Sequence, residues 1–223
     1  MPERDTVELV DGSGVAVGRS QKLRAHEPPG LLHRAFSVFL FSPPPAPRLL
    51  IQRRALSKYH FPGIWANTCC SHPAPAEDVV ESARRRLAEE LGLGVGNAAP
   101  DALSERDLVV GRLVEAAVFV YRAADPKSGL IEHEYDHVLV GTVERRDGGS
   151  PDWDDVLPFA PDEVEEVAWI SIDEAERVAA EDEPGFAPWF AEALALALAS
   201  LAADPLEAEE DVGAERLRER GSP

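Results

Sequence analysis

The chain has 223 residues, of which 44% are hydrophobic, so it can bury one sizeable core or at most two small ones. Twenty-two Lys and Arg residues stand against 41 Asp and Glu residues, and the formal net charge of −19 argues against nucleic-acid binding through a general basic surface. The apolar runs are too short to cross a bilayer, and no basic segment followed by an apolar one opens the chain, so we expect a soluble protein.

The first third of the chain predicts β-strands separated by turns. The segments with strand composition are a hairpin over 7–18 around Asp11-Gly12, a buried strand over 34–42 that ends at a proline-rich run, and a third strand over 48–55. Pro62 and Gly63 then interrupt the pattern. We expect a turn-rich loop over 66–76.

The rest of the chain mixes helices with strands. Apolar residues recur every three or four positions over 77–92, which predicts an amphipathic helix that stops at Gly92. The further elements expected are strands at 116–124, 132–146 and 166–171, a loop at 147–162, a helix at 171–181 and another after Pro188. Because strands and helices do not alternate regularly, the expected fold class is α+β, a mixed β-sheet core covered by helices.

The chain divides into two parts that differ in composition. We expect residues 1–203 to form a single domain, because this part carries the apolar periodicity of helices and strands. Residues 204–223 are rich in charge and contain no aromatic residue, so we expect them to be a disordered tail.

The only cysteines of the chain, Cys69 and Cys70, stand side by side in the segment ANTCCSHP. They could be half of a metal site, a redox pair, or a nucleophile or proton carrier beside the ligand histidine His72. No second cysteine pair exists to complete a zinc site, and adjacent cysteines bridge only through a strained ring. A reducing compartment, the cytoplasm, is therefore expected. On an extended segment neighbouring side chains point to opposite sides, so only one thiol can face a pocket.

The spacing from Ser71 onward resembles the Nudix box, a loop–helix motif whose carboxylates hold a divalent cation on a diphosphate. Glu89 and Glu90 stand at its paired acids, although paired glutamates on a helix can also form a solvated face. Ser71 replaces the glycine of the box, and Arg86 replaces its first glutamate. A cation in place of a metal ligand repels the metal, so the motif favours diphosphate binding over activation of water.

Three separated segments extend this resemblance to one family. They are RRALSKYHFPGIWANTCCSHP over 53–73, the pair His26 and His33, and GLIEHEYDHVL over 129–139. Together they are similar to type 1 isopentenyl-diphosphate isomerase, a Nudix-fold enzyme, from about residue 8 to about residue 200. The resemblance implies one Nudix-like isomerase domain in isoprenoid biosynthesis, which interconverts isopentenyl and dimethylallyl diphosphate by protonating the alkene at one carbon and deprotonating another.

Two other functions stay open beside the isomerase. A Nudix hydrolase of a nucleoside diphosphate derivative would share the fold, and a non-catalytic module would bind the isoprenoid diphosphate without turnover. Neither function needs a thiol in its pocket, so Cys70 and the His/Glu set argue against both.

The resemblance also implies roles for the catalytic residues. Cys70 holds the position of the catalytic cysteine, two residues before the ligand histidine, and Glu134 is the second acid/base group. Tyr121 matches a tyrosine that hydrogen-bonds near the catalytic acid. Trp189 would turn its π face to a carbocation intermediate, with ordinary helix packing as the alternative. Cys69 is then a small buried hydrophobe.

Histidines and glutamates form the expected metal site. Glu132 and Glu134 lie two apart on a predicted strand and so point to one face. Three nitrogens and two or more oxygens suit an octahedral divalent ion such as Mn²⁺ better than tetrahedral zinc. The ligands implied by the resemblance are His26, His33, His72, Glu132 and Glu134. His133 should face the other way, and His60 and His137 are expected to be structural.

Local cations must hold the diphosphate in a chain that is acidic overall. The residues at the phosphate-contacting positions of the family are Lys22, Arg54, Lys58 and Arg86. The resemblance places a second ion, Mg²⁺, on the phosphates through Glu90 and the carbonyl of Cys70. Arg86 would then serve a protein that binds a diphosphate without cutting it.

Overall fold

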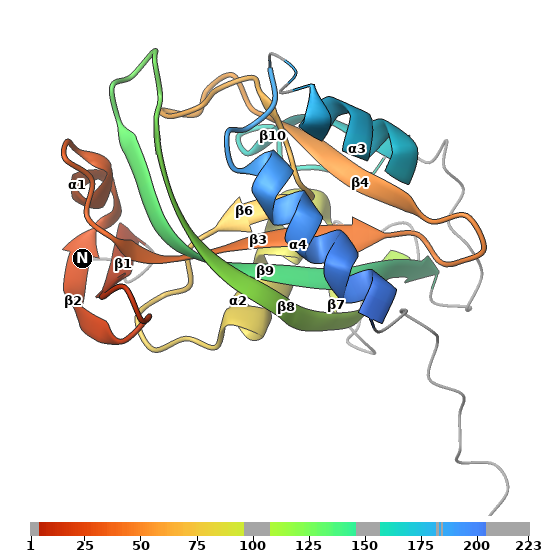
Figure 1. Ribbon diagram of the computed structural model, residues 1–223, viewed down its shortest axis with the longest axis horizontal. Coiled ribbons are helices and arrows are strands. Elements are labelled where there is room, and N and C mark those ends of the chain that lie inside the picture. Colours follow the sequence, from red (N-terminus) through yellow and green to blue (C-terminus); the bar gives the residue numbers. More distant parts are fainter. Residues whose placement is uncertain (1–4, 96–107, 146–156, 182, 184, 204–223) are drawn as a thin grey trace, which may run out of the picture.

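The structure is a computed structural model that describes residues 5–95, 108–145, 157–181, 183 and 185–203. In chain order its elements are β1 (Thr6–Val10), β2 (Ala16–Gln21), α1 (Lys22–His26), β3 (His33–Phe41), β4 (Arg48–Arg54), β5 (Trp65–Ala66), β6 (Cys69–Ser71), α2 (Val79–Leu91), β7 (Gly94–Val95), β8 (Leu108–Ala124), β9 (Ile131–Arg145), β10 (Val164–Ser171), α3 (Ile172–Ala180) and α4 (Phe190–Ala203). Their arrangement can be followed in Figure 1.

One mixed sheet forms the centre of the molecule, with strand order β10-β4-β3-β9-β8-β7. The pairs β3–β9 and β7–β8 are parallel, and the other pairs along this order are antiparallel. The short strands β1 and β6 also pair with β3, so β3 is covered along both of its edges. This position explains the continuous apolar run of β3, which is almost entirely buried. The predicted α+β class with a mixed sheet is confirmed.

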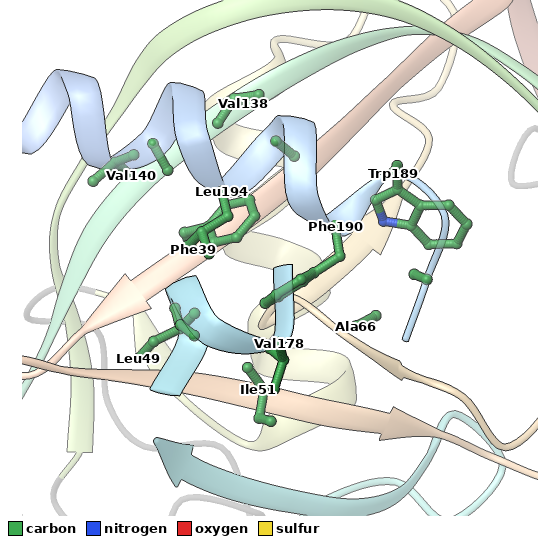
Figure 2. Close-up of a cluster of buried hydrophobic side chains, with 14 of the residues drawn as sticks. Phe39, Leu49, Ile51, Ala66, Val138, Val140, Val178, Trp189, Phe190 and Leu194 are labelled. Atoms are coloured by element: carbon green, nitrogen blue, oxygen red, sulfur yellow. The ribbon is translucent and has the colours of Figure 1, made fainter. Parts of the chain in front are cut away.

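Helices cover both faces of the sheet. On one face α3 and α4 pack over a cluster that includes Phe39, Val138 and Phe190. Figure 2 shows this cluster, with Trp189 at one end of it, just before α4 begins. On the opposite face α2 packs its apolar stripe, which includes Leu87, against another buried cluster of the sheet. The acid/base candidates described below, Cys70 and Glu134, lie on the α4 face, whereas Arg86 and Glu90 come from α2 on the opposite face.

The ends of helix α2 have local causes. The Asp78 side chain accepts a hydrogen bond from the Glu81 backbone N–H at 3.0 Å and so caps the first turn. Gly92 adopts a left-handed conformation with φ of 61°, which ends the helix at little steric cost. The predicted helix over 77–92 is thus confirmed to within two residues.

The segment over 66–76 is not only a loop, contrary to the prediction. Cys69–Ser71 forms β6, which pairs with residues Phe36–Val38 of β3. The part of the β3 edge that lies between its pairings with β1 and β4 supplies hydrogen bonds to β6, which the turn-rich composition does not reveal. Helix α1 and the first half of β8 were not predicted either, because neither has a clear apolar period.

The predicted tail over 204–223 lies wholly outside the described residues. The predicted loop over 147–162 lies outside them as far as residue 156. Within the described ranges, no helix is both long and apolar enough to cross a membrane.

Candidate active site

An open outer cleft leads to a narrow inner cavity on the α4 face of the sheet. The cleft has a volume of about 780 Å³, and the inner cavity has a volume of about 30 Å³. The two share wall residues, among them Lys22, Lys58 and Arg86, so the cavity opens into the cleft. The inner cavity is lined in addition by Arg54, His60, Cys70, Tyr121, Glu132, Glu134 and Trp189.

The register of the sheet places the acid/base candidates on one face. Ser37 of β3 pairs with Cys70 on one edge and with Val138 on the other edge. Residues that pair directly point to the same face, and every second residue along a strand shares that face. Cys70 and Glu134 therefore share a face, yet they come from strands on opposite edges of β3. Cys69 points the other way, into the core beneath α2.

The Cys70 thiol is half-buried, and a hydrogen bond to Asn67 holds it in place. Its Sγ donates to the side-chain oxygen of Asn67 at 2.9 Å, and the Trp189 Nε1 donates to the same oxygen at 3.1 Å. Burial, chiefly, raises the pKa of Cys70 to about 12, and the nearby Arg54 acts against this shift. At neutral pH the thiol is therefore protonated and can serve as a proton source.

Glu134 lies between a tyrosine and the histidines. The Tyr121 hydroxyl donates to one carboxylate oxygen at 2.7 Å, while the other oxygen lies 2.8 Å from the Nε2 of His72. Burial and the charge of Glu132 raise the pKa of Glu134. Burial and the charge of Glu134 in turn raise the pKa of Tyr121 well above its ordinary value, so the tyrosine hydroxyl stays protonated. Glu134 is therefore set up to take and release a proton.

Five side chains converge on one point beside Glu134: His26, His33, His72, Glu132 and Glu134. One ligand atom from each lies within 4.8 Å of the others. The Nδ1 of His26 lies 2.7 Å from the carbonyl of Lys22, and the Nδ1 of His33 lies 2.7 Å from the carbonyl of Leu31. If each Nδ1–H donates to its carbonyl, the two Nε2 atoms carry lone pairs that face the cluster.

The chemistry of this cluster fits a divalent cation. The Nε2 of His26 and the Oε2 of Glu132 lie 2.9 Å apart, yet neither atom has a hydrogen-bond partner among the described residues. Buried polar atoms normally have a partner, and a cation between these two atoms would supply one. Burial and the positive charge of Lys22 lower the pKa of His72 well below its ordinary value, which favours the neutral imidazole that can ligate.

One contact of the cluster was missed by the sequence analysis. The Nε2 of His60, a buried residue, lies 2.7 Å from the Oε1 of Glu132. No spacing in the sequence links these two positions. The other two histidines lie outside the cluster: His133 Nδ1 is 3.1 Å from the carbonyl of Gly30, and His137 contacts Arg34 and Glu115.

Four cationic side chains line the inner cavity: Lys22, Arg54, Lys58 and Arg86. Lys22, Lys58 and Arg86 also line the outer cleft and so stand at the junction of the two. The Arg54 guanidinium donates to the carbonyls of Phe61 and His60, at 3.0 and 3.2 Å. Burial, followed by the charges of Lys58, Arg86 and Arg54, lowers the pKa of Lys22 to about 8, while Glu132 acts in the opposite direction. Positive charge is therefore concentrated here, in a chain whose net charge is −19.

Glu90 lies apart from the five-residue cluster. Its buried carboxylate on α2 pairs with Arg86 at 2.5 Å and lies 3.4 Å from the side-chain nitrogen of Gln52. Arg86 also contacts Glu89 at 2.8 Å. The substituted position of the box thus carries an arginine that is paired with both of the acids that follow it.

Comparisons with known proteins agree on the family. The NUDIX domain model matches residues 31–192. The chain is 44% identical to the isopentenyl-diphosphate Delta-isomerase of Nocardia farcinica over 86% of this chain and 93% of that protein. It is 45% identical to the isomerase of the same name from Streptomyces coelicolor, over 82% and 79% of the two chains. The fold is similar to the crystal structure of DR0079 from Deinococcus radiodurans, with a TM-score of 0.57 and 21% identity over 86% of this chain and 98% of that one.

Proposed function

The chain belongs to the NUDIX family and, within it, to the isopentenyl-diphosphate Delta-isomerases, and we propose that it interconverts isopentenyl diphosphate and dimethylallyl diphosphate. The observation that carries this proposal is that a protonated, half-buried thiol, Cys70, and a carboxylate, Glu134, lie on one face of the sheet. Both line a cavity whose mouth is surrounded by cations. This arrangement suits an isoprenoid diphosphate, whose alkene reaches the acids while its phosphates stay at the mouth.

The reaction moves one proton onto the alkene and takes another away. Protonation of the terminal carbon leaves a tertiary carbocation, and loss of a proton from the neighbouring CH₂ restores the double bond in its new position. An alkene is a poor base, so the acid must be close and sheltered from water. Cys70 and Glu134 come from opposite edges of β3 and are the two groups that exchange protons with the substrate.

Trp189 would stabilise the positive charge that forms between these two steps. Its buried indole lines the cavity, and the hydrogen bond from Nε1 to Asn67 holds the ring in place. A desolvated cation–π contact contributes about 2 kcal/mol. Tyr121, with its ring centroid 5.6 Å from that of Trp189, holds Glu134 through its hydroxyl.

The metal and phosphate sites complete the proposal. His26, His33, His72, Glu132 and Glu134 would hold Mn²⁺ or another octahedral ion, whose charge sets the proton affinity of Glu134. Lys22, Arg54, Lys58 and Arg86 would hold the diphosphate. Glu90 and the carbonyl of Cys70 would hold Mg²⁺ on the phosphates.

The test is an isomerisation assay in heavy water with isopentenyl diphosphate and added Mg²⁺ and Mn²⁺. We expect an acid-labile allylic product that carries solvent deuterium, no release of phosphate, and loss of activity after chelation that metal restores. Phosphate release that matches turnover would instead favour a NUDIX hydrolase. Arg86 argues against a hydrolase, because it stands where the Nudix box has its first glutamate. A hydrolase needs that carboxylate to hold the metal that activates water.

The same proposal covers location and partners. The two cysteines are free, which supports the cytoplasm as the compartment. The partner is the small-molecule diphosphate itself, because the cations that would bind it line one cavity in a chain whose net charge is −19.

A further inference from the structure

Glu163 pairs with two of the four cations that line the cavity, and both of these lie at its mouth. One carboxylate oxygen pairs with the Lys58 ammonium, and the other lies 3.2 Å from the Arg86 guanidinium. The side chain is 28% exposed and lines the outer cleft together with Lys22. A single carboxylate therefore bridges two groups that the proposed function assigns to the diphosphate.

The fold holds this carboxylate in place. The Ala55 backbone N–H donates to the Glu163 carbonyl at 3.0 Å, directly after β4, and the Glu163 N–H donates to the Ala160 carbonyl at 2.9 Å. The Ala160 N–H in turn donates to the Glu90 carbonyl on α2, at 2.8 Å. The turn that carries Glu163 is thus tied to the same two elements that position Lys58 and Arg86.

Electrostatics makes Glu163 a competitor of an anionic ligand. Burial acts to raise the pKa of Glu163, but Lys58 and Arg86 outweigh burial and lower this pKa, so the carboxylate is ionised at neutral pH. A diphosphate needs the same N–H donors and carries the same sign of charge. Its binding must therefore break both ion pairs or accept repulsion from Glu163.

We propose that Glu163 is an internal counter-ion of the diphosphate subsite, which pairs with Lys58 and Arg86 in the free enzyme and releases them when the diphosphate binds. The inference rests on the proposed function, because it assumes that these two cations contact the phosphates. Glu163 then weakens binding of both substrate and product and favours release of product. Without Glu163, Arg86 would still be held in place by its contacts with Glu89 and Glu90. Glu163 therefore matters less for the position of Arg86 than for competition with the diphosphate.

The test measures binding of inorganic pyrophosphate by calorimetry to the intact protein, with and without Mg²⁺. Glu163→Gln should bind pyrophosphate roughly fivefold more tightly under both conditions, as expected for loss of a partly buried competing pair. The matched control, Glu165→Gln, removes the same charge from an exposed side chain two residues away and should change the affinity less than about twofold. A gain of affinity cannot result from misfolding.

Two results would overturn the counter-ion role. Weaker binding of Glu163→Gln only when Mg²⁺ is present would make Glu163 a ligand of a phosphate-bound ion. Unchanged affinity under both conditions would show that the carboxylate does not compete at all. Failure of the unaltered protein to bind pyrophosphate is a different result, since it would refute the diphosphate subsite and with it the proposed function.

Discussion

Replacing each of the two adjacent cysteines by alanine should separate catalysis from packing. Cys70 faces the cavity and carries a proton at neutral pH, whereas Cys69 lies in the core beneath α2. Cys70→Ala removes the thiol that is proposed to exchange a proton with the substrate, and Asn67 and Trp189 beside it cannot replace an acid. Turnover should therefore fall by at least the roughly hundredfold to ten-thousandfold typical of a lost acid/base group.

Cys69→Ala should act on stability instead. The Cys69 side chain is fully buried among apolar residues such as Val38 and Leu87. Loss of one buried sulfur resembles loss of one methylene with a small cavity left behind, which costs about 1 kcal/mol. In a chain of this size that cost lowers Tm by about 2–4 °C. Most of the turnover should remain, because the side chain does not reach the cavity.

The assay compares both variants in two measurements, formation of acid-labile allylic product and thermal unfolding. We expect Cys70→Ala to lose turnover while keeping a Tm close to that of the unaltered protein, and Cys69→Ala to do the reverse. Equal loss of turnover in the two variants, or greater loss in Cys69→Ala, would refute the assignment of the thiols.

Three further changes test the site. His60→Asn should weaken metal binding about tenfold to a hundredfold, because His60 contacts Glu132 and would orient this proposed metal ligand. Equilibrium dialysis of the metal measures the change, and an unchanged affinity would contradict the role of His60. Pyrophosphate affinity should fall as pH rises through about 8, where the Lys22 ammonium loses its charge, and Lys22→Arg should flatten this pH profile. A flat profile in the unaltered protein would show that the charge of Lys22 does not contribute to binding. Trp189→Phe should retain part of the turnover and Trp189→Ala much less; equal rates would leave the ring a packing role only.

Much of the local structure follows from the sequence alone. The limits of α2 depend on Asp78 and Gly92, which act on backbone groups within a few residues. The shared face of Glu132 and Glu134, and the opposite faces of Cys69 and Cys70, follow from the two-residue period of an extended chain. These features could be predicted because each depends on residues that are close in sequence.

The composition of the site was also accessible, but only through resemblance. The residues expected at the metal, His26, His33, His72, Glu132 and Glu134, lie together in the structure. Their spacing along the chain does not bring them together, since the register of β3 with β9 and the position of β6 decide which side chains meet.

The tertiary structure alone decided three features of this protein. It made β6 a strand, because the edge of β3 offered hydrogen bonds. It brought His60 to Glu132, and it placed Glu163 between Lys58 and Arg86. Burial and charge also set the proton affinities on which the chemistry depends. Such effects fall off over a few ångströms in space regardless of distance along the chain, so a pattern of neighbours in the sequence determines the elements, and their packing determines the chemistry.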